Sequence, residues 1–330
     1  MYNVYNSCKF GVKRMRREAY KKILDVGSSD AAKERSIVYL AEHLGKFLKK
    51  KERVLICFLE HKEGNLSWLM EQAALRCGAV PVIWGPDHRW KTLLQQAFYS
   101  RASAVIGPPL VILGLTKLKK YNNTPLYIRR VITAGYPCLD WMIDGIVKGL
   151  DCEAGGCFSL GETGVVAGFA CGHSWGIHLR QEEYGAEIVD ENGRELPSGQ
   201  VGEIVIYPQS NPSVRFPMGE FARMETAPCA CGSSTPRLMD FGPGITEDKD
   251  LAALGQYLQS WTSILDCRVT KDEFGLEIEI ICFPGEKLPQ LPNAAKLVIR
   301  PWNPKNDEPF WYLPAVKTAI SGVPVEQGSL

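Results

Sequence analysis

ERVLICFLEHKEGNLSWLMEQAALRCGAVPVIWGPDHRWKTLLQQAFYSRASAVIG, residues 52–107, is the stretch that decides the fold. Three short apolar runs, at 52–60, 79–85 and 103–107, have the length and boundaries of buried strands. Two longer segments with helical spacing of apolar residues separate them, and Asn65 is placed to cap the first. Strands that alternate with helices of this length predict parallel strands joined by crossover helices.

The alternation continues on both sides of this stretch. Upstream, residues 31–50 predict an amphipathic helix, because Ile37, Leu40, Leu44 and Leu48 recur at helical spacing. Downstream, a helix, a strand and a further helix are predicted in turn at 110–121, 129–135 and 138–150. The first 150 residues therefore predict an α/β core with a parallel sheet.

The pattern changes near residue 180. Residues 183–208 contain two strand-like runs around an Asn-Gly turn, which is typical of an antiparallel hairpin. A Gly/Pro-rich passage at 239–247 marks a boundary. Beyond it a helix, a hairpin and a strand are predicted at 250–261, 264–283 and 295–302. We expect a large α/β core with a parallel sheet and an antiparallel β-hairpin region at 1–242, and a small α+β C-terminal lid domain at 243–330.

Composition narrows the class of protein. The 330 residues carry 38 Lys and Arg against 37 Asp and Glu, a net charge of +1, which argues against a general binder of nucleic acid. The sequence lacks an apolar run of membrane-spanning length and an apolar leader, so we expect no membrane partner and a cytoplasmic location. An odd number of cysteines, 11, fits reduced thiols better than a disulfide framework.

A group of cysteine and histidine residues has the spacing of metal ligands. Cys171 and His178 form C-x6-H, and Cys229 and Cys231 form C-x-C. A Cys₃His set separated by a hairpin is typical of structural zinc, because thiolates and imidazole favour zinc over magnesium or calcium. His173 is a competing ligand, and free thiols in loops are the alternative.

Several segments, taken in series, resemble one family. They are RRVITAGYPCLD at 129–140, CFSLGETGVVAG at 157–168, HLRQEEYGAEIVDENGRELPSGQVGEIVIYP at 178–208, VRFPMGEF at 214–221 and TAPCACGSSTPRL at 226–238. In content and order they resemble the adenylate-forming acyl-CoA synthetases, in particular the phenylacetate-CoA ligase-like branch. The match runs from about residue 53 to residue 242, and the hairpin and C-x-C-G portions are its most specific parts. In that branch the C-x6-H and C-x-C elements recur as a structural zinc site.

The resemblance implies a reaction in two steps. A carboxylic acid and ATP give an acyl-adenylate and pyrophosphate, and a thiol, usually coenzyme A, then displaces AMP. Carboxylate and phosphate are both anionic, so cations must neutralise them during attack. By resemblance Glu162 holds Mg²⁺, Lys317 is the catalytic lysine of the lid, and Glu220 replaces an aspartate that grips both ribose hydroxyls. A turn-capping role for Glu162 and a surface role for Lys317 are the alternatives.

The nucleotide and acid pockets are also implied by the resemblance. Tyr136 and Phe158 match positions that pack against adenine, and Gly135 and Ser159 lie beside them in the same two segments. The same residues are also ordinary core aromatics in a fold of this kind. For the acid, His61, Trp84 and Tyr136 are the candidates, and a flat apolar pocket favours an aryl or another small carboxylic acid.

The nucleotide motifs depart from the family pattern. The segment nearest to its phosphate loop is NSCKFGVKR, where Ser7, Gly11 and Lys13 keep their register. A basic N-terminal arm is the alternative there. Gly161 replaces the threonine before the motif glutamate, and the hinge segment at 241–244 lacks its arginine. We expect an N-terminally shortened member of the family.

Two rival functions remain open on this sequence. The departures from the family's nucleotide motifs also fit a nucleotide- or acyl-binding homologue with weakened catalysis. Alternatively, adenylation is retained and the acceptor is a protein thiol, such as a carrier protein, or an amine. The expected partners are therefore a small carboxylic acid and ATP, with coenzyme A or a carrier protein as acceptor, and a homodimer is compatible with the sequence.

Overall fold

The structure is a computed structural model. It describes residues 19, 21–136, 138–161, 163–172, 176–242, 249–272, 275–294 and 296–310. No helix among these residues is both long and apolar enough to cross a membrane.

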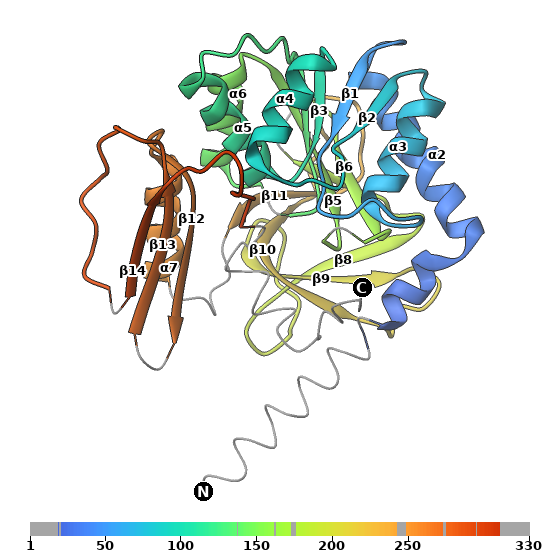
Figure 1. Cartoon of the computed structure of the whole chain (residues 1–330). Helices are drawn as coiled ribbons and strands as arrows, with labels where there is room; N and C mark the ends of the chain where they lie inside the picture. The colour runs from blue at the N-terminus through green and yellow to red at the C-terminus, as the bar shows by residue number, and fades with distance from the viewer. Residues whose placement is uncertain are drawn as a thin grey trace, which may run out of the picture.

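The central feature of the described chain is one eleven-stranded sheet of mixed direction (Figure 1). Its first half is parallel, in the order β2-β1-β3-β4-β5. These strands are β1 (Arg53–Ile56), β2 (Val80–Ile83), β3 (Ala104–Gly107), β4 (Arg130–Thr133) and β5 (Glu153–Ser159). The predicted parallel core is confirmed.

The second half of the sheet is antiparallel and follows in the order β6-β7-β11-β10-β9-β8. Its strands are β6 (Val166–Ala170), β7 (Ile177–Leu179), β8 (Tyr184–Val189), β9 (Val201–Pro208), β10 (Phe216–Glu225) and β11 (Arg237–Gly242). The predicted hairpin is β8 with β9. The sequence did not indicate that it belongs to the same sheet as the parallel strands.

Helices cover both faces of the parallel strands (Figure 1). They are α2 (Asp30–Phe47), α3 (Leu66–Arg76), α4 (Trp90–Tyr99), α5 (Pro109–Tyr121) and α6 (Asp140–Leu150). Alternate residues of β1 point to opposite faces, so Val54 and Ile56 pack with α2 and α3, whereas Leu55 packs with α4, α5 and α6. Asn65 caps α3 as predicted, and its side chain accepts the Trp68 N–H at 3.1 Å.

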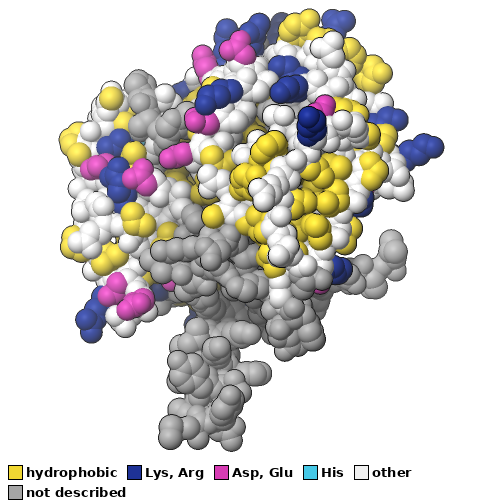
Figure 2. Space-filling view, turned by 90° about the vertical axis from the view of Figure 1, so that its left-hand side faces the viewer, with side chains coloured by type: hydrophobic (Ala, Val, Ile, Leu, Met, Phe, Trp, Pro, Cys, Tyr) yellow, Lys and Arg dark blue, Asp and Glu magenta, His cyan; other side chains and the backbone are white. Residues whose placement is uncertain are grey.

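A smaller sheet of β12 (Ile264–Asp272), β13 (Gly275–Cys282) and β14 (Lys296–Pro301) follows α7 (Lys249–Ser260) in the described part of the chain. β12 and β13 form the predicted hairpin, and β14 pairs with β13 in parallel. Figure 2 views the molecule from this side and shows hydrophobic side chains gathered on part of the face. On the edge strand β14, Leu297, Val298 and Ile299 are 37–42% exposed.

The smaller sheet is docked on the large one. Leu265, Ile281 and Phe283 belong to the same buried cluster as α4, α5 and α6, and the Phe283 ring stacks on Tyr121 with centroids 4.2 Å apart. Lys117 of α5 is buried, and its Nζ donates to the carbonyls of residues 259 and 264 at 2.7 and 2.8 Å. The boundary expected at residue 243 falls on 243–248, outside the described residues. One buried cluster joins the two parts, and the C-terminal part has a second cluster of its own.

Candidate functional site

A cavity of about 490 Å³ lies where β4 and β5 meet α6 and β11. Gly155 and Gly156 of β5 form part of its wall, and a Cβ on Gly156 would lie 3.2 Å from the Ile177 Cδ1 atom. The absence of a side chain at Gly156 therefore leaves room in the cavity, whereas a Cβ on Gly155 would meet Phe47, which is not a lining residue. The cavity is flanked by the segments after β4 and β5, at the edge of a parallel sheet where ligands commonly bind in α/β proteins.

Aromatic side chains line this cavity. Tyr136 and Phe158, both predicted to contact adenine, are among its lining residues. Phe241 of β11 is a third, and its ring centroid lies 5.9 Å from that of Phe158. The cavity therefore has the flat apolar walls that a planar ring system requires.

The polar groups of the cavity are acidic. Asp140, Asp144 and Asp240 line it, and its described lining residues include no Lys or Arg. Arg223 forms an ion pair with Asp240, which offsets one of these charges. Carboxylates accept hydrogen bonds from hydroxyl and amino groups but repel phosphate. The described walls therefore suit the nucleoside end of a nucleotide, and its phosphates need cations from elsewhere.

Glu220 lies on β10, beside the strand that carries Phe241. The register of β10 shifts between Pro217 and Phe221, so the strand is irregular over the stretch that contains Glu220. The residue is only 8% exposed, and burial raises the pKa of its carboxyl to about 8. Phe221 pairs with Gly242, which places this stretch next to the cavity wall, although Glu220 itself is not a lining residue.

The two loops that carry the predicted nucleotide contacts approach each other. Gly135 and Gly161 both have positive φ, +87° and +56°, and a Cβ on Gly161 would lie 4.0 Å from the Gly135 oxygen. Ser159 is buried, and its hydroxyl donates to the Gly161 carbonyl at 2.8 Å, which stabilises the turn after β5. Gly135 and Ser159 thus flank the cavity from neighbouring loops but are not lining residues.

The two other predicted acid contacts lie apart from this cavity. His61 is held by α3, with Nδ1 3.0 Å from the Ser67 hydroxyl and Nε2 3.2 Å from the Glu71 carboxylate. Trp84 is 2% exposed within the core, and its indole N–H donates to the Thr92 hydroxyl at 3.2 Å. Neither residue lines the cavity: Trp84 packs in the core, whereas His61 is exposed and bonded to α3, so their contacts with the acid stay predictions.

Five predicted site residues cannot be placed. Ser7, Gly11, Lys13, Glu162 and Lys317 lie outside the described residues, so their roles stay predictions. His173, the competing metal ligand, also lies outside them.

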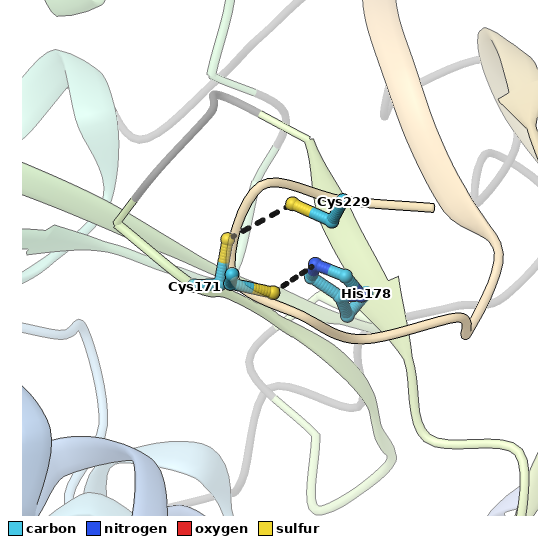
Figure 3. Close-up of side chains that lie close together, drawn as sticks. Cys171, His178 and Cys229 are labelled. Carbon is cyan, nitrogen blue, oxygen red and sulfur yellow. Dashed lines mark hydrogen bonds between the residues drawn. The ribbon is translucent and has the colours of Figure 1, made fainter. Parts of the chain in front are cut away.

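The four predicted metal ligands form one cluster. Cys171, His178, Cys229 and Cys231 bring their ligand atoms within 4.8 Å of one another. The Cys171 and Cys229 sulfurs are 3.7 Å apart, and the Cys231 sulfur is 3.5 Å from His178 Nε2. Figure 3 shows the labelled side chains of Cys171, His178 and Cys229 pointing toward one another.

These separations fit a tetrahedral ion. With Zn–S near 2.3 Å and Zn–N near 2.0–2.1 Å, tetrahedral ligands lie about 3.8 Å apart for two sulfurs and about 3.5 Å apart for sulfur and nitrogen. His178 Nδ1 is 2.8 Å from the Thr235 hydroxyl, and Thr235 is in turn 2.8 Å from the Ser233 hydroxyl. When Nε2 faces a metal, the Nδ1–H donates to Thr235, which holds the ring in position.

Two residues at these sites were not predicted. Thr235 lies within the segment that resembles the family. Its hydroxyl contacts His178 because β7 pairs with β11, where His178 lies opposite Arg237. Phe241 lies in the segment matched to the family hinge. The sequence shows an aromatic residue at that position, which could have indicated a contact with the base. The antiparallel pairing that places the Phe241 ring near Phe158 is not visible in the sequence.

Comparison with known proteins gives matches at the level of structure. No protein-family model matches this chain, and no curated protein does. Among solved structures, 2-hydroxyisobutyryl-CoA ligase in the postadenylation state, in complex with R3-HIB-AMP, is similar with a TM-score of 0.62 at 16% identity, over 77% of this chain and 59% of that one. A benzoate CoA ligase from Burkholderia xenovorans LB400 has a TM-score of 0.53 at 13% identity, over 81% and 62%.

A third similar structure is the amide bond synthetase McbA from Marinactinospora thermotolerans, with a TM-score of 0.50 at 14% identity, over 77% of this chain and 57% of that one. The chain thus spans about three-fifths of the length of the proteins that it matches. The chain therefore has the fold of the adenylate-forming enzymes.

Proposed function

We propose that this protein activates a carboxylic acid with ATP as an acyl-adenylate. The observation that carries the proposal is the cavity that Tyr136, Phe158 and Phe241 line beside β5, in a chain with the fold of enzymes of that class. The aromatic walls suit adenine, and the carboxylates of the cavity suit its amino group and the ribose hydroxyls. Glu162 and Lys317 are the proposed partners of Mg²⁺ and of the reacting carboxylate and phosphate.

For the second step we propose transfer of the acyl group to a thiol, with coenzyme A as the first candidate. Two of the similar structures are CoA ligases, and one of these is a benzoate CoA ligase, which supports an aryl or small acid. An amine acceptor is the alternative, because the fold is also similar to that of an amide bond synthetase.

Pyrophosphate release from ATP·Mg²⁺ tests adenylation directly. A panel of aryl and short aliphatic acids is compared for the wild type, Glu162→Gln and Tyr136→Ala. The matched controls are Glu286→Gln and Tyr127→Ala, which change exposed residues outside the cavity. We expect release with one class of acid, its loss in Glu162→Gln and a KM for ATP raised roughly tenfold in Tyr136→Ala.

The other outcomes are equally informative. Silence across the panel, from protein that is folded and binds AMP, favours the second candidate function, a nucleotide-binding homologue without catalysis. The observation that favours this candidate is the acidic lining of the cavity, whose described residues include no Lys or Arg, since catalysis on phosphate requires cations. Such a protein should bind AMP without dependence on Mg²⁺, as isothermal titration measures.

We also infer that the Cys₃His cluster binds a structural zinc ion. Its donor set and separations fit zinc, and the ion would tie the segment after β6 to the loop before β11 without touching the cavity. We expect about one zinc per chain by elemental analysis, its loss in Cys231→Ser and a lower melting temperature in that variant. Cys152→Ser changes a thiol outside the cluster and should keep both the metal and the stability.

A further inference from the structure

A second cavity, of about 710 Å³, lies between α5, α6 and the end of α7. It is distinct from the cavity beside β5, and the two share no lining residue. Its size is within the range of small-molecule sites in proteins. Neither the resemblance nor the proposed adenylation assigns it a role.

All the charged residues among the described lining of this second cavity are lysines. Lys117, Lys119, Lys120 and Lys148 line it, and its described lining includes no Asp or Glu. Lys117 uses its three N–H donors on the Gln259 side chain and on the carbonyls of residues 259 and 264, so it contributes charge to the cavity but no free donor. Lys119 Nζ donates to the Gly149 carbonyl at 3.0 Å. Lys120 has no ion-pair partner among the described residues. Four ammonium groups around one concavity create a positive potential that attracts a multivalent anion.

Lys148 remains available to a ligand. Its ion pair with Asp144 spans 3.5 Å, and both side chains are largely exposed, at 79% and 68%. An ion pair of this kind contributes little free energy, so an anion with several charges competes for the lysine.

Helix α6 separates the two cavities and divides their charge. Trp141, Gly145 and Lys148 recur at helical spacing on the face toward the lysines. Asp140 and Asp144 lie on the face toward the cavity beside β5. One helix therefore presents carboxylates to the first site, and a lysine with an indole ring to the second.

From this arrangement we propose that the lysine-lined cavity binds a ligand that carries two or more phosphate groups. The ammonium groups neutralise the phosphates, and the Thr124 hydroxyl on the cavity wall can donate to a phosphate oxygen. Trp141 gives the cavity an aromatic wall, which suits the base of a nucleotide as well as phosphates alone. This site stands apart from the proposed adenylation and is tested by binding.

Isothermal titration with inorganic tripolyphosphate and with ADP tests the proposal. The wild type is compared with the double variant Lys120→Glu, Lys148→Glu, with its conservative counterpart Lys120→Arg, Lys148→Arg, and with the control Lys91→Glu, Lys287→Glu. The control lysines are exposed and outside the cavity. We expect charge reversal to weaken tripolyphosphate binding by roughly tenfold or more, and the arginine and control variants to stay within about twofold of the wild type.

Two further titrations, one with ADP and one at increasing salt concentration, extend the test. Any ADP that binds beside Tyr136 should still bind to the charge-reversed variant. Only the ADP binding that is lost in that variant is therefore assigned to the lysine-lined cavity. A loss of that binding in Trp141→Leu, with tripolyphosphate unaffected, assigns a nucleotide; no loss assigns phosphate alone. Binding should weaken as salt rises, because the contacts are ionic. The proposal is wrong if the wild type shows no saturable binding of tripolyphosphate, or if the reversed variant binds it as the wild type does.

Discussion

Glu220 illustrates how one side chain can make stability depend on pH. Burial raises the pKa of its carboxyl to about 8, against an ordinary value of 4.5. Between these two values the folded protein holds a proton that the unfolded chain has released. The free energy of unfolding therefore falls as the pH rises from about 4.5 to about 8, and the loss is complete above that range.

The variant Glu220→Gln removes this titration. We expect wild type and variant to differ little near pH 4, and the variant to be more stable by roughly 2–4 kcal/mol near pH 9. Urea unfolding across this range measures the difference. Glu191→Gln changes an exposed carboxylate and should show no such trend. A constant difference between wild type and Glu220→Gln at all pH values contradicts the buried ionisation.

At the residue scale the sequence predicts chemistry better than orientation. Cys171, His178, Cys229 and Cys231 were predicted together because thiol and imidazole groups at these spacings have few other uses, and they form one cluster. Trp84 was predicted to line the acid pocket; it is buried and does not line the cavity beside β5, so that role stays a prediction. An aromatic residue after a strand can face either way, and the packing of α4 decides which.

At the scale of elements, the parallel half of the sheet could be predicted because each strand and helix carries its own periodic pattern. The antiparallel half could not be predicted in full. β7 is only three residues long, and β10 contains Pro217 and Gly219, which weaken a strand pattern. The partner of β7 is β11, some 60 positions along the chain, and pairing over such a distance leaves no local signal.

Helix α5 carries the contact that joins the two sheets. Lys117 donates to two backbone carbonyls and to the Gln259 side chain, and the Gln259 amide in turn donates to the buried Asp266 carboxylate at 2.8 Å. Burial lowers the pKa of Lys117 to about 8, and the Asp266 carboxylate opposes part of this shift. The ammonium group satisfies backbone acceptors that no water reaches.

Replacing this ammonium group should therefore be costly. Lys117→Met keeps the apolar stem and leaves the carbonyls of residues 259 and 264 without their donor, so we expect a loss of about 2–4 kcal/mol in the free energy of unfolding. Denaturant titration gives the value. Lys91→Met, on the exposed surface of α4, is the control and should change it by less than about 0.5 kcal/mol. Equal stability of Lys117→Met and wild type would show that the carbonyls find other donors.

At the scale of the whole molecule, the docking of the C-terminal sheet bears on how the protein works. The resemblance implies a lid domain at 243–330 that rotates between the two half-reactions. In the described residues, Leu265, Ile281 and Phe283 are at most 1% exposed within the core of α4, α5 and α6. Undocking would expose these three side chains to water, at a free-energy cost of about 5–9 kcal/mol. It would also break the hydrogen bonds of Lys117. That cost is comparable to the stability of a whole domain.

We therefore expect residues 249–310 to stay docked during turnover and to unfold together with the large sheet. Calorimetry should show one cooperative transition, and Phe283→Ala should lower its midpoint as a whole, because the ring belongs to the shared core. Leu258→Ala lies in the separate core of the C-terminal sheet and tests whether that sheet can melt alone. Hydrogen exchange of the Trp90 amide at the start of α4, which donates to the Asp307 carbonyl of the C-terminal part at 2.9 Å, reports on the docked state. If ATP and a substrate acid accelerate that exchange, the sheet undocks and acts as a lid; if they leave it unchanged, both half-reactions proceed on a fixed C-terminal sheet.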